Sequence, residues 1–226
     1  MGRYKAVVFD LDGTLQDSKI DFQKMTERVR EILINEGIPE SSLGDRRAVY
    51  LIIRGGGDSL LELGVRDDRV QTVLRLMTEA INETELEATD SVEPKRNALQ
   101  TLETLHRNGI LLGIATRSHR AYAERCLAEM GMRHYIRGLL ARDDVPFPKP
   151  DPRHLFETIA LLEVDPGDVL YVGDTTTDLE TARAAKVDFV GYMRDDAWGQ
   201  RLLDAGCDLL AEDLLEVAEM VLKPRE

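Results

Sequence analysis

The sequence predicts an α/β protein with a doubly wound parallel sheet and an inserted set of helices. Short apolar runs recur along the chain, and amphipathic helical stretches separate them. The runs are continuous rather than alternating, which is typical of strands buried on both faces of a parallel sheet. Such strands in alternation with helices predict the doubly wound (Rossmann-like) arrangement.

The strands are expected where the apolar runs fall. Between them, leucine and isoleucine recur at helical spacing, as at Leu99, Leu102 and Leu105. The expected strands are residues 6–9, 110–115, 135–140, 169–172 and 189–192, with a weaker one at 208–210.

One interval shows only helical patterns. Its two apolar stripes are Phe22, Met25, Val29 and Ile32, then Val70, Val73, Leu74, Met77 and Ile81. Glycines predict helix breaks at residues 37–39, 55–57 and 64. We therefore expect two domains, a core of residues 1–16 and 91–226 and an inserted helical domain of residues 17–90.

Composition narrows the class of protein. The chain has 29 Lys and Arg against 42 Asp and Glu, a net charge of −13, so we expect neither nucleic acid nor a membrane as a partner. Hydrophobic residues make up 43% of the chain, enough to fill a core. No apolar run reaches the roughly 18 residues of a membrane span, and the first residues do not resemble a signal peptide. We expect a cytoplasmic protein whose two cysteines are reduced.

The segment Asp10-Leu11-Asp12-Gly13-Thr14 directly follows the first expected strand. Two carboxylates two residues apart on an extended loop point the same way, so they need a cation nearby or one of them must hold a proton. Gly13 permits a tight turn. This segment is the strongest candidate for chemistry in the chain.

Three further segments follow expected strands or enter helices, where open α/β sheets bind ligands. Thr116 offers a hydroxyl at a helix entry, and Lys149 is aimed by prolines on both sides. Asp174 follows a strand, and Asp178 lies one helical turn later. Taken singly, each has an ordinary explanation as a helix cap or a solvated side chain. Their joint order along the chain carries the inference.

In this order and spacing, the motifs resemble those of the haloacid dehalogenase (HAD) superfamily over nearly the whole chain. The inserted helices resemble the type-1 cap of its phosphoglycolate phosphatase-like members. The resemblance implies a core strand order of 3-2-1-4-5, with Asp10 and Asp174 on adjacent strands. It also implies a phosphatase.

The resemblance, together with the chemistry of the residues, implies a role for each aspartate. Asp10 is the expected nucleophile, and Asp12 the expected general acid and base. Mg²⁺ prefers oxygen ligands, and the expected set is Asp10, the backbone carbonyl of Asp12 and Asp174, with Asp178 as a ligand or its partner.

The remaining residues are expected to bind the substrate. Thr116 and Lys149 would hold the phosphoryl oxygens. Arg117 would add a positive charge, and the sequence leaves open which way its side chain points. In the cap, Arg54, Gly55 and Gly56 are expected to form a loop that contributes to specificity; the alternative is a plain turn with a solvated arginine. The expected partner is a small phosphate ester, either phosphoglycolate or a sugar phosphate, and the protein is expected to be a monomer or a homodimer.

Two alternatives stay open at this point. A β-phosphoglucomutase-like phosphomutase shares the same motifs and cap, because the difference lies mostly in cap residues. A non-catalytic protein on the same scaffold is the other alternative, and it is disfavoured because no motif residue is missing.

Overall fold

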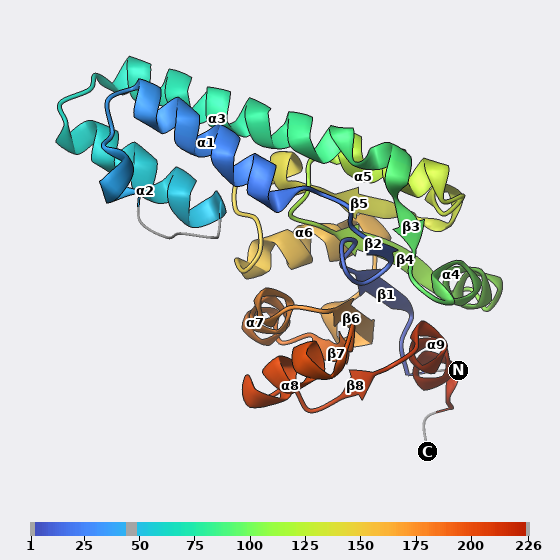
Figure 1. The fold of residues 1–226 in the computed structure, drawn as a ribbon. Helices are drawn as coiled ribbons and strands as arrows, with labels where there is room; N and C mark the ends of the chain where they lie inside the picture. Colours follow the sequence, from blue (N-terminus) through green and yellow to red (C-terminus); the bar gives the residue numbers. More distant parts are fainter. Residues whose placement is uncertain (1–2, 44–48, 225–226) are drawn as a thin grey trace. The chain divides into compact units, whose positions relative to one another are not determined.

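The computed structural model describes residues 3–43 and 49–224, and the side chains of residues 49–54 lie outside that description. The chain divides into two compact units (Figure 1). The core unit consists of Met1–Ser18 and Asp90–Glu226, and the helical unit of Lys19–Thr89.

Within the described residues of the core unit, six parallel strands form one sheet in the order β5-β4-β1-β6-β7-β8. Counted along the chain, this is the predicted order 3-2-1-4-5 with a sixth strand added beyond the fifth. β1 is central, and its Phe9 lies opposite Ile114 on one side and Val172 on the other. The strands are β1 (Ala6–Phe9), β4 (Leu111–Ala115), β5 (Gly138–Leu140), β6 (Val169–Gly173), β7 (Asp188–Tyr192) and β8 (Leu210–Ala211).

Helices cover both faces of this sheet (Figure 1), which explains why the strands read as continuous apolar runs. Val7 and Phe9 pack into the cluster that holds α4, α5 and α9. Ala6 and Val8 point to the opposite face and pack with α6 and α7. The helices are α4 (Ala98–Arg107), α5 (Arg120–Glu129), α6 (Pro152–Leu162), α7 (Thr176–Ala185), α8 (Asp196–Asp204) and α9 (Leu214–Leu222).

Two elements of the core unit differ from expectation. The strand expected at 135–140 begins only at Gly138, because Arg133–Tyr135 form a short 3-10 helix. Gly138 then permits close packing, since a Cβ there would lie 2.9 Å from the Cβ of Leu161 on α6. A two-stranded antiparallel ribbon, β2 (Gln16–Asp17) with β3 (Glu93–Pro94), was not expected.

The helical unit contains α1 (Phe22–Asn35), α2 (Val49–Glu62) and α3 (Asp67–Glu87). The predicted stripe on α3 is buried at Val70, Val73, Met77 and Ile81. Of the stripe predicted on α1, Met25 and Val29 are buried, Ile32 is only partly buried and Phe22 is exposed; Leu33, outside that stripe, is buried instead.

The predicted helix break at residues 55–57 is wrong, because α2 continues through all three glycines. Packing explains the glycine at position 56: a Cβ on Gly56 would lie 2.8 Å from both methyl carbons of Leu33. Gly56 therefore lets α2 approach α1 closely, and the three glycines do not open a loop.

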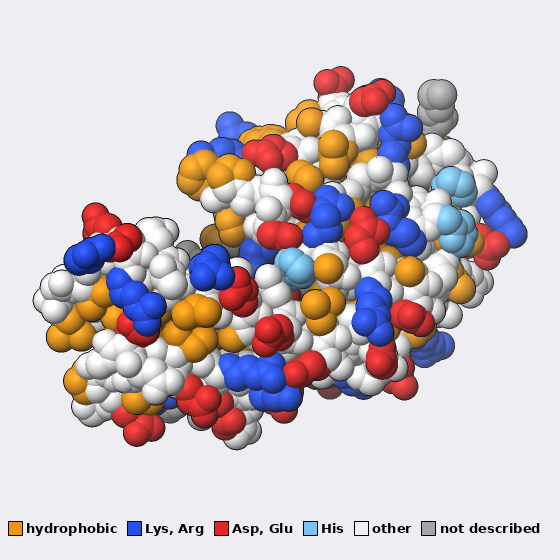
Figure 2. All heavy atoms as spheres, turned by 90° about the horizontal axis from the view of Figure 1, so that it is seen from above, with side chains coloured by type: hydrophobic (Ala, Val, Ile, Leu, Met, Phe, Trp, Pro, Cys, Tyr) orange, Lys and Arg blue, Asp and Glu red, His pale blue; other side chains and the backbone are white. Residues whose placement is uncertain are grey.

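Three properties of the described residues bear on the protein's class. No helix among them is long and apolar enough to cross a membrane. Cys126 and Cys207 are buried free thiols. The face drawn in Figure 2 shows acidic and basic side chains interspersed, so the net charge of −13 is not gathered into one acidic field there.

Candidate active site

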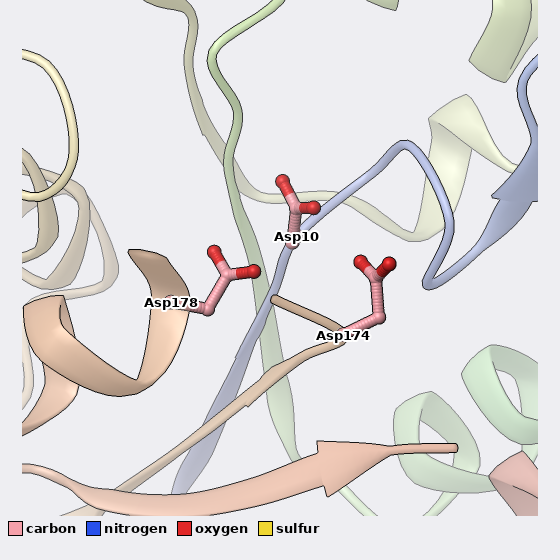
Figure 3. A group of neighbouring side chains, drawn as sticks. All are labelled: Asp10, Asp174 and Asp178. Atoms are coloured by element: carbon pink, nitrogen blue, oxygen red, sulfur yellow. The ribbon is translucent and has the colours of Figure 1, made fainter. Parts of the chain in front are cut away.

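Three buried aspartates converge at the carboxyl ends of the central strands (Figure 3). Asp10 directly follows β1, Asp174 directly follows β6, and Asp178 lies in the first turn of α7. One carboxylate oxygen of each lies within 4.8 Å of the others. The parallel pairing of β1 with β6 causes this meeting, because the Asp10 backbone N–H donates to the Val172 carbonyl at 2.8 Å.

Lys149 lies at the centre of what we call the lysine cluster: Asp10, Lys149, Tyr171, Asp174 and Asp178. Its Nζ donates to Asp10 Oδ1 at 2.7 Å, to Asp178 Oδ1 at 2.6 Å and to the Tyr171 hydroxyl at 2.9 Å. The Tyr171 hydroxyl donates in turn to Asp178 Oδ1 at 2.6 Å. A buried ammonium is stable only when it is paired in this way.

The backbone of Lys149 is anchored by a buried histidine. The Lys149 N–H donates to His154 Nδ1 at 3.2 Å, so the imidazole is neutral and its proton is on Nε2. That nitrogen donates to the Leu140 carbonyl at 3.1 Å, at the end of β5. Burial lowers the pKa of His154 to about 4, which keeps it neutral near pH 7.

Burial and charge act differently on the carboxyl groups of the lysine cluster. Burial raises the pKa of Asp10 well above its ordinary value, against the opposing charge of Lys149. Burial and the neighbouring Asp178 raise the pKa of Asp174 to about 6. Burial also acts to raise the pKa of Asp178. The charge of Lys149 and hydrogen bonds from Lys149, Thr175 and Tyr171 outweigh it, so the pKa lies below the ordinary value.

The donor set suits a divalent cation. The three aspartates carry more negative charge than Lys149 returns, and Arg194 adds one further ion pair, from Nη1 to Asp174 Oδ2 at 3.2 Å. Carboxylate oxygens are the ligands that Mg²⁺ prefers. The cluster could therefore hold a metal ion.

The turn after Asp10 is shaped around Asp174. Gly13 has φ +90°, and a Cβ there would lie 2.8 Å from Asp174 Cγ, so a side chain is excluded on both grounds. Thr14 Oγ1 donates to Asp174 Oδ1 at 3.0 Å. This turn ties the loop after β1 to the end of β6.

Asp12 lies in different surroundings, which we call the Asp12 cluster: Asp12, Gln16, Ser118 and Tyr122. Asp12 is only partly buried, and it is not one of the three converging carboxylates. Its Oδ1 accepts from Gln16 Nε2 at 2.7 Å and from the Tyr122 hydroxyl at 2.9 Å, and its Oδ2 accepts from Ser118 Oγ at 2.5 Å. Burial, and then the charge of Asp12, raise the pKa of Tyr122, so the phenol stays a donor.

The other expected phosphate ligands follow β4. Thr116 is buried, its N–H donates to the Leu140 carbonyl at 3.0 Å, and its Oγ1 accepts from the Ser118 N–H at 3.1 Å. Arg117 is exposed, and its carbonyl accepts from Arg142. Thr116 is thus placed at the site edge of the sheet, and both phosphate-binding roles stay predictions.

The expected specificity residues lie in the helical unit. Gly55 and Gly56 are part of α2, so the reason for expecting a loop there no longer holds. The side chain of Arg54 lies outside the described residues. A role for Arg54, Gly55 and Gly56 in specificity stays a prediction without a described contact.

Sequence reasoning missed several members of both clusters. Tyr171 could have been found, because a hydroxyl in a buried strand needs a polar partner. Arg194 lies two residues past β7, at the same edge of the sheet as the aspartates, which was also a usable signal. No local pattern marks Ser118 or Tyr122.

Comparisons with known proteins agree on one family. The family model described as haloacid dehalogenase-like hydrolase matches residues 7–192. The chain is 31% identical over 189 residues to phosphoglycolate phosphatase 1 of Pseudomonas aeruginosa, covering 81% of this chain and 67% of that protein. It is 29% identical over 185 residues to the N-acetylmuramic acid 6-phosphate phosphatase of the same organism, covering 81% and 79%.

Solved structures share the fold. A hydrolase from Pseudomonas syringae has a TM-score of 0.70 at 24% identity, over 95% of this chain and 96% of that one. A candidate β-phosphoglucomutase from Thermotoga maritima has a TM-score of 0.62 at 24% identity, over 96% and 100%. The chain belongs to the haloacid dehalogenase-like hydrolases, and its curated relatives are phosphatases.

Proposed function

We propose that this haloacid dehalogenase-like phosphatase hydrolyses a small phosphate ester with Mg²⁺, through a phosphate covalently bound to Asp10. The observation that carries the proposal is the contact of the Lys149 ammonium with Asp10 and Asp178 inside three converging carboxylates. A cation fixed beside a carboxylate is suited to binding the anionic oxygens of a phosphoryl group that reaches Asp10.

Asp10 and Asp12 divide the chemistry between them. A carboxylate oxygen of Asp10 forms a bond to phosphorus, while the bond from phosphorus to the ester oxygen breaks. Asp12 gives its proton to the departing oxygen, then takes a proton from the water that releases phosphate from Asp10. The two carboxylates lie two residues apart in sequence but have separate partners, which fits separate roles.

Asp10, Asp174 and the backbone carbonyl of Asp12 would hold Mg²⁺, with Asp178 as a ligand or as the partner that orients Lys149. When bound, the ion neutralises charge on the phosphoryl oxygens. Lys149, Thr116 and Arg117 would bind the same oxygens from the protein side. Thr14 keeps Asp174 directed at the site by donating to its carboxylate, with which Arg194 also forms an ion pair.

The proposed substrate is a small phosphorylated metabolite, with phosphoglycolate or a sugar phosphate favoured. The names of the relatives support this choice, since they act on phosphoglycolate and on N-acetylmuramic acid 6-phosphate. We propose the helical unit as the cap that selects among such esters, and a cytoplasmic location for the protein.

The test uses the Asp10→Asn variant and p-nitrophenyl phosphate. We expect Mg²⁺-dependent phosphate release by the native chain, its loss on chelation, and no release by Asp10→Asn, whose circular dichroism spectrum stays native. Asp208→Asn is the matched control, because Asp208 is exposed and far along the chain from the site. Activity retained in Asp10→Asn would contradict the assignment of the nucleophile.

A second assay of phosphate release, with a sugar phosphate as substrate, distinguishes a phosphatase from a phosphomutase. A mutase given a sugar 1-phosphate and its bisphosphate activator yields the 6-phosphate with little free phosphate, whereas a phosphatase releases phosphate. Failure to turn over any of a broad panel of phosphate esters with Mg²⁺ would instead favour a non-catalytic role.

A further inference from the structure

The carboxylate of Asp12 is held by three neutral side chains from three different segments. Gln16 lies on β2, Ser118 on the loop after β4, and Tyr122 on α5. Gln16 and Tyr122 are completely buried, and they also contact each other, Nε2 to hydroxyl, at 2.9 Å. Side chains from three segments of the core unit thus meet at one partly exposed carboxylate.

The hydrogens of this network can be assigned consistently. The Gln16 amide has two N–H groups, one for Asp12 Oδ1 and one for the Tyr122 oxygen. The Tyr122 hydroxyl then gives its own hydrogen to Asp12 Oδ1. The reversed amide would place Gln16 Oε1 against the carboxylate, so only one orientation of the amide suits Asp12. In that orientation Gln16, Tyr122 and Ser118 each direct one donor at the carboxylate oxygens.

The count of acceptor positions then distinguishes the two oxygens of Asp12. A carboxylate offers about four lone-pair positions, two on each oxygen. Gln16 and Tyr122 occupy both positions on Oδ1, and Ser118 occupies one on Oδ2. The one position left is on Oδ2. Rotation of the carboxylate would exchange the oxygens, and the two donors on Oδ1 oppose that rotation.

We propose that Tyr122 is a positioning residue that presents Oδ2 of Asp12 to the leaving oxygen of the phosphate ester. The proposal rests on the function proposed above. In the transfer step, the electron pair of the broken phosphorus–oxygen bond goes to the leaving oxygen, which takes its proton from Oδ2. Tyr122 keeps its own proton throughout and acts through its hydrogen bond to Asp12.

This role makes a chemical prediction that a purely structural role does not. A nitrophenolate leaves with little help from a proton, whereas an alkoxide from a glycolate or sugar ester requires one. Misplacement of Asp12 Oδ2 must therefore slow the alkyl esters more than the aryl ester. Loss of packing or folding would slow both by the same factor.

The experiment compares Tyr122→Phe with the native chain on p-nitrophenyl phosphate and on phosphoglycolate, as kcat/KM with Mg²⁺. We expect a loss of about 10-fold or more on phosphoglycolate and less than about threefold on the aryl ester, since one hydrogen bond to a charged group is removed. Tyr135→Phe is the matched control, because Tyr135 is partly buried and packs on His106 and His134. Equal losses on both esters, or no loss, would overturn the proposal.

A melting experiment tests the contact without relying on activity. Tyr122→Phe is expected to lower Tm by about 2–4 °C in the native chain and clearly less in an Asp12→Ala background, where the acceptor is gone. An equal shift in both backgrounds would contradict the contact. If the native chain hydrolyses neither ester, the proposed function fails and the catalytic part of this inference with it, while the melting result still decides whether Tyr122 holds Asp12.

Discussion

The lysine cluster and the Asp12 cluster hold two aspartates of one motif in opposite ways. Asp10 is buried and paired with the ammonium of Lys149, whereas Asp12 is partly exposed and accepts from two hydroxyls and an amide. A charged partner stabilises an ionised nucleophile, while neutral donors fix the geometry of a carboxylate without neutralising it. The difference shows how one short loop can supply two carboxylates with separate tasks.

The largest expected effect comes from Lys149→Met, which removes the only charge shared by Asp10 and Asp178 in the described contacts. Leaving buried carboxylates without their cation is expected to lower the free energy of unfolding by about 3–5 kcal/mol. Phosphate release should fall by about 10³-fold. Urea unfolding and initial rates measure both. Lys5→Met is the control, since the exposed Lys5–Asp168 pair should contribute under about 1 kcal/mol.

The free energy of unfolding should fall in acid because His154, which anchors the backbone of Lys149, becomes protonated. Its pKa is about 4 when folded and near 6.5 when unfolded, so the unfolded chain binds the proton first as pH falls. The stability that neutral His154 contributes is present above pH 6.5 and is lost progressively towards pH 4, to an extent on the order of 3 kcal/mol.

Urea unfolding at pH 7.5 and pH 4.5 measures this loss. We expect His154→Gln to show a weaker pH dependence than the native chain, and the exposed His134→Gln to keep the native dependence. Identical pH dependence in the native chain and His154→Gln would be evidence against a buried neutral imidazole beneath Lys149.

Neutralising Asp10 and neutralising Asp178 should have different effects on the stability of the fold. The pKa of Asp10 is raised, so its charge opposes folding at pH 7.5, and Asp10→Asn should leave Tm unchanged or raise it. The pKa of Asp178 is lowered, so its charge stabilises the fold above the unfolded pKa, and that contribution is lost as pH falls. Asp178→Asn should cost about 2 kcal/mol. Melting curves recorded with a chelator present measure the Tm of both variants. A lowered Tm in both would contradict the opposite roles of the two charges.

The smallest expected effect concerns Arg194. Its guanidinium pairs with the carboxylate of Asp174 and would compete there with Mg²⁺. Removing a positive charge next to the proposed cation ligands should strengthen Mg²⁺ binding, by about fivefold after allowance for the exposure of Arg194. Calorimetric titration of Arg194→Met with Mg²⁺ measures this. Arg201→Met is the matched control, because Arg194 and Arg201 each lie 4.7 Å from the Trp198 ring. Equal affinities in the two variants would show that Arg194 does not act on the site.

Much of the core unit could be predicted because its signals are local. A continuous apolar run predicts a strand buried on both faces, and Asp10 and Asp174 directly after β1 and β6 mark where those strands end. Two predictions about element boundaries were wrong, for different reasons. The three glycines of α2 were interpreted as a helix break, but Gly56 serves close packing against Leu33, a non-local cause. The strand expected at 135–140 starts late for a local reason, because a 3-10 helix precedes it.

The amino-acid sequence was enough to predict the fold class and the aspartates that follow β1 and β6, because hydrophobic periodicity and motif spacing are properties of the chain. The strand order of the core came from the resemblance of the motifs to a known family. The contacts of each aspartate became known from the folded chain alone. Tyr122 and Ser118 are more than 100 residues from Asp12 along the chain, and they reach it because core packing sets the rotation of α5 beside β4. Partners at such separation are chosen by packing between elements, which no local pattern records.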